Sequence, residues 1–378
     1  MNLIHEFNQA DDNVDRLLDI CPDTFYTRPG IIYLTNSHQE IAEAIHTCCV
    51  SKNKKIIAFC DYKEAPNTPF LHFLKNLVTI LTEQYGYNLN QFKYLSGFHP
   101  VKRNYERLQK TFQQFDLPNI THENVNYWER EWQTIINSNT NLDQLENITN
   151  KPYRFLYLGG SPRAHRLLML SFFIENKLLN QSLYSIIDDK QTLVGHCLKY
   201  AHPNNYVPIE DFLKAKDIID FSKIIYPKYL TMQPGQHHKQ HSLSLGELAL
   251  FKSTYLSIIT ETSFFKNDST EENIYNWHLD YSLICEKTLR SIACLHPFIV
   301  TTRPHSLKDL RELGYKTFTP YIDESYDEIE NDYERLKHIQ QIILELSKRS
   351  DEEWTKFCQD VYPIVKHNQN VLRNVGNR

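Results

Sequence analysis

The first half of the chain alternates short apolar runs with amphipathic stretches. Apolar runs at residues 31–35, 55–60 and 92–95 are typical of buried strands. Between and after them, residues 70–85 and 101–115 carry apolar side chains at helical spacing. This alternation predicts a parallel sheet that is covered by helices.

The same alternation starts again after residue 151. The strands expected in this half are at 153–158, 183–187, 255–260 and 297–301. The helices expected are at 163–177, 283–295, 306–313 and from 333 onward. Gly314 directly follows the third of these helices, as a C-terminal cap does. The pattern therefore predicts a second α/β domain that ends in helices.

A polar, asparagine-rich stretch at 119–151 separates the two halves. Linkers between domains are exposed and polar, so we place the boundary near residue 150. The expected organisation is an N-terminal α/β domain at 1–150, a C-terminal α/β domain at 151–345, and C-terminal helices at 346–378.

Composition and charge narrow the class of protein. With 378 residues, 41% of them hydrophobic, the chain has enough apolar side chains for two cores. Its net charge of −5 argues against a nucleic-acid partner. The apolar runs are far shorter than the roughly 20 residues that cross a bilayer, and the N-terminus shows no secretory signal, so we expect a cytoplasmic protein without a transmembrane segment. The eight cysteines form no C-x-x-C pair and are expected to be reduced, buried thiols.

Several common chemistries lack their motifs. No P-loop motif occurs, and Gly159-Gly160 does not extend to a dinucleotide-binding G-x-G-x-x-G. No Asp-x-Asp pair is present to hold a divalent ion on a diphosphate, so we expect no metal and no other cofactor. Histidines 237, 238 and 241 offer a zinc site as one alternative, but a flexible loop suits their Pro/Gly setting better. The acidic run at 323–332 is expected to be a solvated turn and helix start.

The segment after the expected strand 153–158 suits a phosphate. Glycines permit close backbone approach, and the start of the next helix presents N–H groups and a positive dipole. Arg163, His165 and Arg166 add donors, and arginine can bind a phosphate with two parallel hydrogen bonds. The alternative is a solvated, basic first turn.

A carboxylate and a Glu-Lys pair are expected at the same edge of this second sheet. Glu261 follows a strand directly, and Glu286 with Lys287 begins a helix. Open α/β sheets bind ligands at the carboxyl ends of their strands. A glutamate can accept hydrogen bonds from the hydroxyls of a ribose, and a lysine can neutralise a diphosphate. In the alternative interpretation, Glu286 complements the helix dipole and Lys287 is solvated.

The order of these segments resembles a known family. The segment Thr260-Glu-Thr-Ser263, the segment Glu286-Lys-Thr-Leu289 and the strand after His296-Pro297 are similar to the E-N-S, T-E-K-L and V-P-V-V segments of α1,3-fucosyltransferases. Exostosin-like and related glycosyltransferases share the layout. Thr262 stands where the fucosyltransferases have Asn, and Cys285 stands where they have Thr.

The resemblance covers residues 155–329, about half of the chain. It implies a GT-B fold, in which two Rossmann-like domains face each other across a cleft and the C-terminal domain holds a nucleotide-sugar. It also implies that Glu286 binds the ribose, that Lys287 and Arg166 bind the diphosphate, and that Glu261 lies at the sugar. The expected activity is inverting, metal-independent transfer of that sugar to a glycan or another hydroxyl acceptor.

The general base is expected on the acceptor side, in a loop of the N-terminal domain. A base must lie within hydrogen-bond reach of the attacking hydroxyl. Asp61 and Glu64 follow the expected strand at 55–60, and His99 follows the one at 92–95. These three residues are the candidates.

Two other functions fit the same residues. A non-catalytic protein could keep the fold to bind a nucleotide-sugar or a carbohydrate. A transferase that glycosylates modified bases in DNA also uses two domains, although the charge of −5 argues against it.

Overall fold

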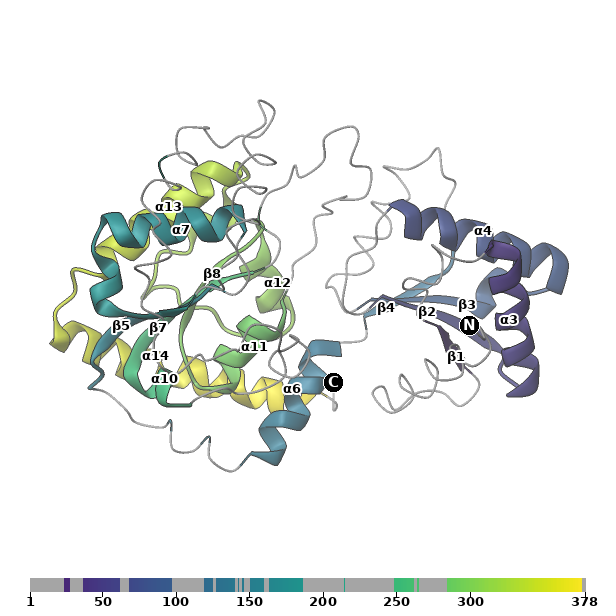
Figure 1. Cartoon of the computed structure of the whole chain (residues 1–378). Helices are drawn as coiled ribbons and strands as arrows, with labels where there is room; N and C mark the ends of the chain where they lie inside the picture. The colour runs from purple at the N-terminus through teal and green to yellow at the C-terminus, as the bar shows by residue number, and fades with distance from the viewer. Residues whose placement is uncertain are drawn as a thin grey trace. The chain divides into compact units, whose positions relative to one another are not determined.

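The computed structural model describes the chain in separate segments. They comprise residues 24–27, 37–61, 68–96, 119–124, 127–139, 142, 145, 150–159, 163–185, 214, 248–261, 264 and 284–375. They divide into two compact units, with the division between Tyr127 and Trp128. Each unit contains a parallel sheet of its own (Figure 1).

The sheet of the first unit has four parallel strands in chain order. They are β1 (Thr24–Thr27), β2 (Ile56–Asp61), β3 (Phe92–Ser96) and β4 (Thr121–Asn124). Helix α3 (His38–Ser51) connects β1 to β2, and α4 (Thr68–Tyr85) connects β2 to β3. The short 3-10 helix η1 (Leu89–Gln91) precedes β3.

The helices described in this unit, α3 and α4, pack against each other because each has one buried face. In α3, Ile41 and Ile45 are one turn apart and fully buried, and α4 contributes Leu74 and Leu77 in the same way. Phe59 of β2 is fully buried as well. The first unit therefore has an apolar core of its own.

The sheet of the second unit is also parallel, but its order is β6-β5-β7-β8. Its strands are β5 (Tyr153–Leu158), β6 (Ser182–Ser185), β7 (Thr254–Thr260) and β8 (Phe298–Thr301). Its helices are α6 (Tyr127–Ser138), α7 (Ala164–Glu175), α10 (Leu248–Ser253), α11 (Glu286–Ala293), α12 (Ser306–Glu312), α13 (Asp332–Leu346) and α14 (Asp351–Arg373). The 3-10 helices are η4 (Leu178–Gln181) and η5 (Ser325–Glu328).

Helices cover both faces of this second sheet (Figure 1). Helices α7 and α13 lie together on one face, where Gln340 donates to the carbonyl of Leu168 over 3.3 Å. Helices α11 and α14 lie on the other face, where Gln369 donates to the carbonyl of Ala293 over 2.8 Å. All seven residues of β7 are buried, as expected for a strand that has helices on both sides.

The expected α/β class is confirmed, and so are most of the expected elements. Of the strands and helices expected in the second half, all are present with shifts of a few residues at their ends, although a break separates α13 from α14. Gly314 follows α12 with φ of +86°, the left-handed conformation of a C-terminal cap. The strand expected at 31–35 and the helix expected at 101–115 lie outside the described residues.

The expectation of a polar linker at 119–151 is wrong for its described part, which contains β4 and α6. Helix α6 packs in the second unit: Trp132 is fully buried in its core, and Gln133 donates to the carbonyl of Arg373 over 2.8 Å. The two units therefore divide at the start of α6, between Tyr127 and Trp128, whereas the sequence placed the boundary near residue 150.

Among the helices of the described segments, none combines the length and the apolar character that crossing a membrane requires.

Candidate functional site

The second sheet reverses its winding direction between β5 and β7. From β5 the chain runs outward to β6, and it then returns to β7 on the other side of β5. Ligands of open parallel α/β sheets bind at such a reversal, outside the carboxyl ends of the strands. The start of α7 follows β5, Glu261 follows β7, and the start of α11 contacts Glu261. Three segments singled out in the sequence therefore meet at this reversal.

The first turn of α7 is hydrogen-bonded to the end of β7. His165 Nε2 lies 2.9 Å from the carbonyl oxygen of Glu261, and Arg166 Nη2 donates to the carbonyl of Thr260 over 3.0 Å. Because a carbonyl oxygen only accepts, Nε2 of His165 carries the hydrogen. Both side chains are buried, whereas Arg163, the N-cap residue of α7, is partly exposed. Arg163 is therefore the more accessible arginine of this turn.

The expectation that His165 offers a donor to a phosphate is wrong. Its Nε2–H group is used by the carbonyl of Glu261. Burial lowers the pKa of His165 well below its usual value, and the positive charges of Arg166, Arg163 and Lys287 lower it further. His165 is therefore neutral at pH 7 and joins α7 to the end of β7.

Glu286 and Lys287 form an ion pair in the first turn of α11. Lys287 Nζ lies 2.7 Å from Oε1 of Glu286 and 3.8 Å from Oε2 of Glu261. The side chains of Lys287 and Glu286 are 21% and 18% exposed, whereas that of Glu261 is fully buried. Burial works against both charges, but the carboxylates of Glu261 and Glu286 raise the pKa of Lys287, and Lys287 lowers the pKa of Glu286. Both members of the pair are therefore ionised at pH 7.

Among the described residues of this region, basic side chains outnumber acidic ones. The basic residues are Arg163, Arg166, Lys287 and Arg290, and the acidic residues are Glu261 and Glu286. We call these six residues the switch-point group, because they lie where the sheet reverses its winding direction. Four basic side chains against two acidic ones leave a surplus of two positive charges. Helix α7 adds to it, because its first turn holds no acidic residue and its N-cap side chain accepts no hydrogen bond. A ligand with two negative charges, such as the diphosphate of a nucleotide-sugar, matches this surplus.

Five residues expected to bind the donor are therefore close together in the structure. They are Arg163, Arg166, Glu261, Glu286 and Lys287.

Of the three candidates for the general base, Asp61 is the last residue of β2 and lies at the carboxyl end of that strand. Glu64 and His99 lie outside the described residues.

The sequence placed Cys285 and Thr288 in this region without assigning either a role, and it did not single out Arg290. Cys285 is the N-cap residue of α11, and Thr288 lies in its first turn. Both donate to the carboxylate of Glu261. A buried carboxylate needs hydrogen-bond donors. The signal that could have identified Cys285 and Thr288 was their position on either side of the Glu286-Lys287 pair, where their side chains can donate to such a carboxylate.

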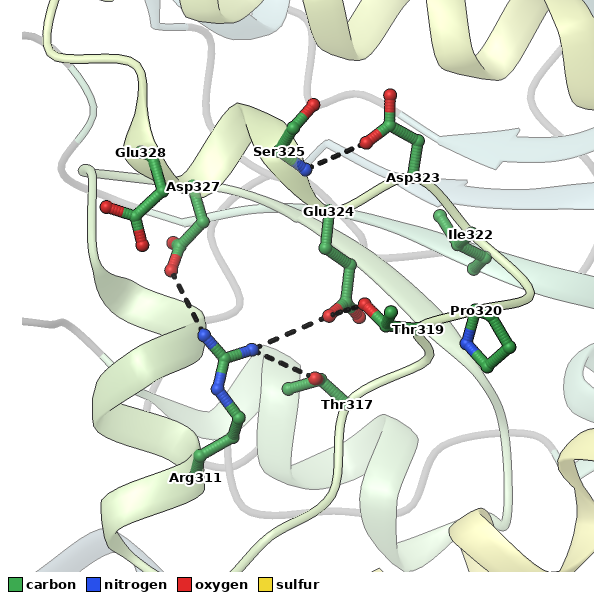
Figure 2. Close-up of a pocket in the computed structure, with 10 residues that line it drawn as sticks. All are labelled: Arg311, Thr317, Thr319, Pro320, Ile322, Asp323, Glu324, Ser325, Asp327 and Glu328. Carbon is green, nitrogen blue, oxygen red and sulfur yellow. Dashed lines mark hydrogen bonds and ion pairs between the residues drawn. The ribbon is translucent and has the colours of Figure 1, made fainter.

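A separate hollow of about 690 Å³ lies beside α12 and η5 (Figure 2). Its carboxylates already have partners within the protein. Asp327 accepts from the backbone N–H groups of Leu307 and Lys308 over 3.0 and 3.1 Å, and Glu324 lies 3.5 Å from Arg311. The expectation that the acidic run is solvated is therefore wrong for Asp327, which is 3% exposed. The hollow holds none of the residues expected from the sequence to bind a donor or act as a base.

Removal of the Asp327 carboxylate should affect stability and not ligand binding. We expect Asp327→Ala to lower the free energy of unfolding by about 1–3 kcal/mol, because the buried N–H group of Leu307 and the partly buried N–H group of Lys308 lose a charged acceptor. Chemical denaturation measures this change. The affinity for pyrophosphate should equal that of the parent, and a loss would show that the hollow takes part in binding. Glu328→Ala is the matched control, because that side chain is 67% exposed.

In the described part of the chain, no group of three or more His, Cys, Asp or Glu side chains is arranged to hold a metal ion. Histidines 237, 238 and 241 lie outside that part. Comparisons with models of known protein families, with curated proteins and with solved structures find no match to this chain.

Proposed function

We propose that this protein is a glycosyltransferase that moves a sugar from a nucleoside diphosphate to a hydroxyl acceptor. The observation that carries the proposal is the switch-point group, with its surplus of two positive charges at the reversal of a parallel sheet. The resemblance of residues 155–329 to α1,3-fucosyltransferases supports it from the sequence. The proposal includes the GT-B arrangement, in which the first unit supplies the acceptor side.

The exposed members of the group are the proposed ligand contacts. Lys287 and Arg163 bind the diphosphate, and Glu286 accepts hydrogen bonds from the ribose hydroxyls. Arg166 is 3% exposed and bonded to Thr260, so it contributes its charge to the site from below the surface. This division follows from burial, since a side chain without solvent contact meets a ligand only after rearrangement.

The same residues suit the chemistry of transfer. When the bond to the sugar breaks, negative charge grows on the leaving diphosphate. An ammonium group, a guanidinium group and the N-termini of α7 and α11 stabilise such charge without reorganisation. Because the chain contains no Asp-x-Asp, we propose that these groups act in place of a divalent ion.

Release of nucleoside diphosphate tests the proposal. UDP-glucose, GDP-mannose, ADP-glucose and dTDP-glucose are each incubated with the protein, with Mg²⁺ or with EDTA. We expect one nucleotide series to bind and to release its diphosphate slowly, at the same rate in both buffers. Binding without release, even with a glycan acceptor, would favour a nucleotide-sugar-binding protein. Absence of binding in every series would contradict the proposed donor site.

A single substitution connects this result to the site. Lys287→Met should weaken binding of the active nucleotide by about 10- to 100-fold, because a charge-assisted hydrogen bond is worth about 1.5–3 kcal/mol. Isothermal titration calorimetry measures the change. Lys356→Met is the matched control, because that lysine is 74% exposed on α14 and pairs with Asp360. An unchanged affinity in Lys287→Met would remove this lysine from the proposed site.

A further inference from the structure

We propose that Glu261 is a positioning residue: it fixes the start of α11 so that Lys287 is directed at the diphosphate, and it does not touch the donor itself. The role rests on the proposed function. It differs from the contact with the sugar that the resemblance implies for Glu261.

The backbone of Glu261 is held from two sides. Its N–H group donates to the carbonyl of Thr301, at the end of β8, over 3.0 Å. Its carbonyl oxygen accepts from His165, in the first turn of α7, over 2.9 Å. Glu261 is therefore joined to β8 and to α7 immediately after β7 ends, and its Cα position is well defined.

The side chain of Glu261 reaches from that fixed point to α11. Oε1 accepts from the hydroxyl of Thr288 over 2.7 Å, and Oε2 accepts from the thiol of Cys285. Burial and the carboxylate of Glu261 raise the pKa of Cys285 well above its usual value, so the thiol keeps its hydrogen and donates. One carboxylate thus binds the N-cap residue and the first turn of the helix.

Lys287 lies between these two donors in the sequence. Its Nζ atom lies 3.8 Å from Oε2 of Glu261, 3.4 Å from Sγ of Cys285 and 2.7 Å from Oε1 of Glu286. The ammonium group therefore faces Glu261 on its buried side, and the lysine side chain as a whole remains 21% exposed. Its place at the surface depends on the buried carboxylate.

Direct contact between Glu261 and a donor does not fit these observations. The residue has no exposed surface, and both carboxylate oxygens already accept hydrogen bonds from α11. A sugar would have to displace Thr288 or Cys285 to reach it. Displacement would leave a buried hydroxyl or thiol without its acceptor.

A double-mutant cycle on pyrophosphate affinity tests the role. Removing a negative charge from a cationic site should by itself strengthen binding of an anion. Loss of positioning has the opposite sign, so we expect Glu261→Gln to weaken pyrophosphate binding by about 10-fold. In the Lys287→Met background the lysine that Glu261 positions is gone and only the charge effect remains, so Glu261→Gln should leave the affinity for pyrophosphate unchanged or strengthen it. The role would be overturned if the losses of affinity from Glu261→Gln and Lys287→Met add up in the double variant, or if Glu261→Gln alone binds pyrophosphate more tightly than the parent.

Cys285 gives a second route to the same answer if Glu261→Gln does not fold. Cys285→Ala removes a donor to Glu261 and should weaken pyrophosphate binding about 3-fold, whereas Cys285→Ser keeps a donor and should restore most of the affinity. Equal affinities of both variants and the parent would overturn the positioning role alone. A parent protein without affinity for pyrophosphate would overturn the proposed function as well.

Discussion

Arg335→Met is expected to lower the free energy of unfolding by about 3–5 kcal/mol, because it breaks a buried ion pair and leaves Asp332 without its cation. Arg335 is 1% exposed, and its Nη2 atom lies 2.5 Å from Oδ1 of Asp332. The guanidinium group also donates to three backbone carbonyls, those of Thr302, Ile329 and Phe264. Arg335 thus holds segments that follow β7 and β8 next to α13. Denaturant-induced unfolding measures the loss.

The control is an ion pair of the same kind at the surface. Lys356 and Asp360 form a pair on α14, where the lysine is 74% exposed, and Lys356→Met should change stability by less than about 1 kcal/mol. The double variant Arg335→Met with Asp332→Leu should recover part of the stability, since neither partner is then left as a buried charge. A cost below 1 kcal/mol for Arg335→Met would show that its bonds are not essential to the fold.

Loss of the general base is expected to reduce turnover by about 10²- to 10⁴-fold while nucleotide affinity stays at the parental value. The candidates are Asp61, Glu64 and His99. Asp61 ends β2, and the carboxyl ends of parallel strands are where α/β sheets place reactive groups. Asp61→Asn, Glu64→Gln and His99→Ala are each assayed for transfer and for nucleotide binding.

Measuring turnover and nucleotide affinity together distinguishes a general base from a residue that contacts the donor. A base variant loses turnover only, whereas Lys287→Met loses affinity. Rescue of turnover in Asp61→Asn at high pH, where the acceptor hydroxyl ionises more readily, would support Asp61 as the base. If all three variants turn over as the parent does, the base is another residue or the reaction uses none.

The sequence predicted best the strands and helices in which the apolar pattern follows burial directly. Strand β7 is buried on both faces, so its apolar run was easy to recognise. Strand β4 lies at the edge of its sheet and reads Thr-His-Glu-Asn, without an apolar residue, so no pattern predicted it. Helix α6 was missed although Trp128, Trp132, Ile135 and Ile136 have helical spacing, because the asparagine-rich stretch around it was interpreted as a linker. Its contact with α14 and with the second core explains why Trp132 and Ile136 are buried.

The sequence predicted where the site lies but not how its residues contact one another. Glu261, Glu286 and Lys287 were expected at one edge because carboxyl ends of parallel strands share an edge, and the structure brings them together. Burial of Glu261 depends on Cys285 and Thr288, which lie 24 and 27 residues further along the chain. No local pattern predicts contacts at that separation, so a residue expected at the sugar is instead a buried acceptor.

Hydrogen–deuterium exchange with bound nucleotide tests the donor site most directly. The nucleoside diphosphate with the highest affinity among UDP, GDP, ADP, dTDP and CDP is added, and exchange is compared with that of the free protein. We expect slower exchange in the first turns of α7 and α11 and at Glu261, with no change in the hollow beside α12. Slower exchange at residues 317–328, with none at the starts of α7 and α11, would contradict a donor site at the switch-point group.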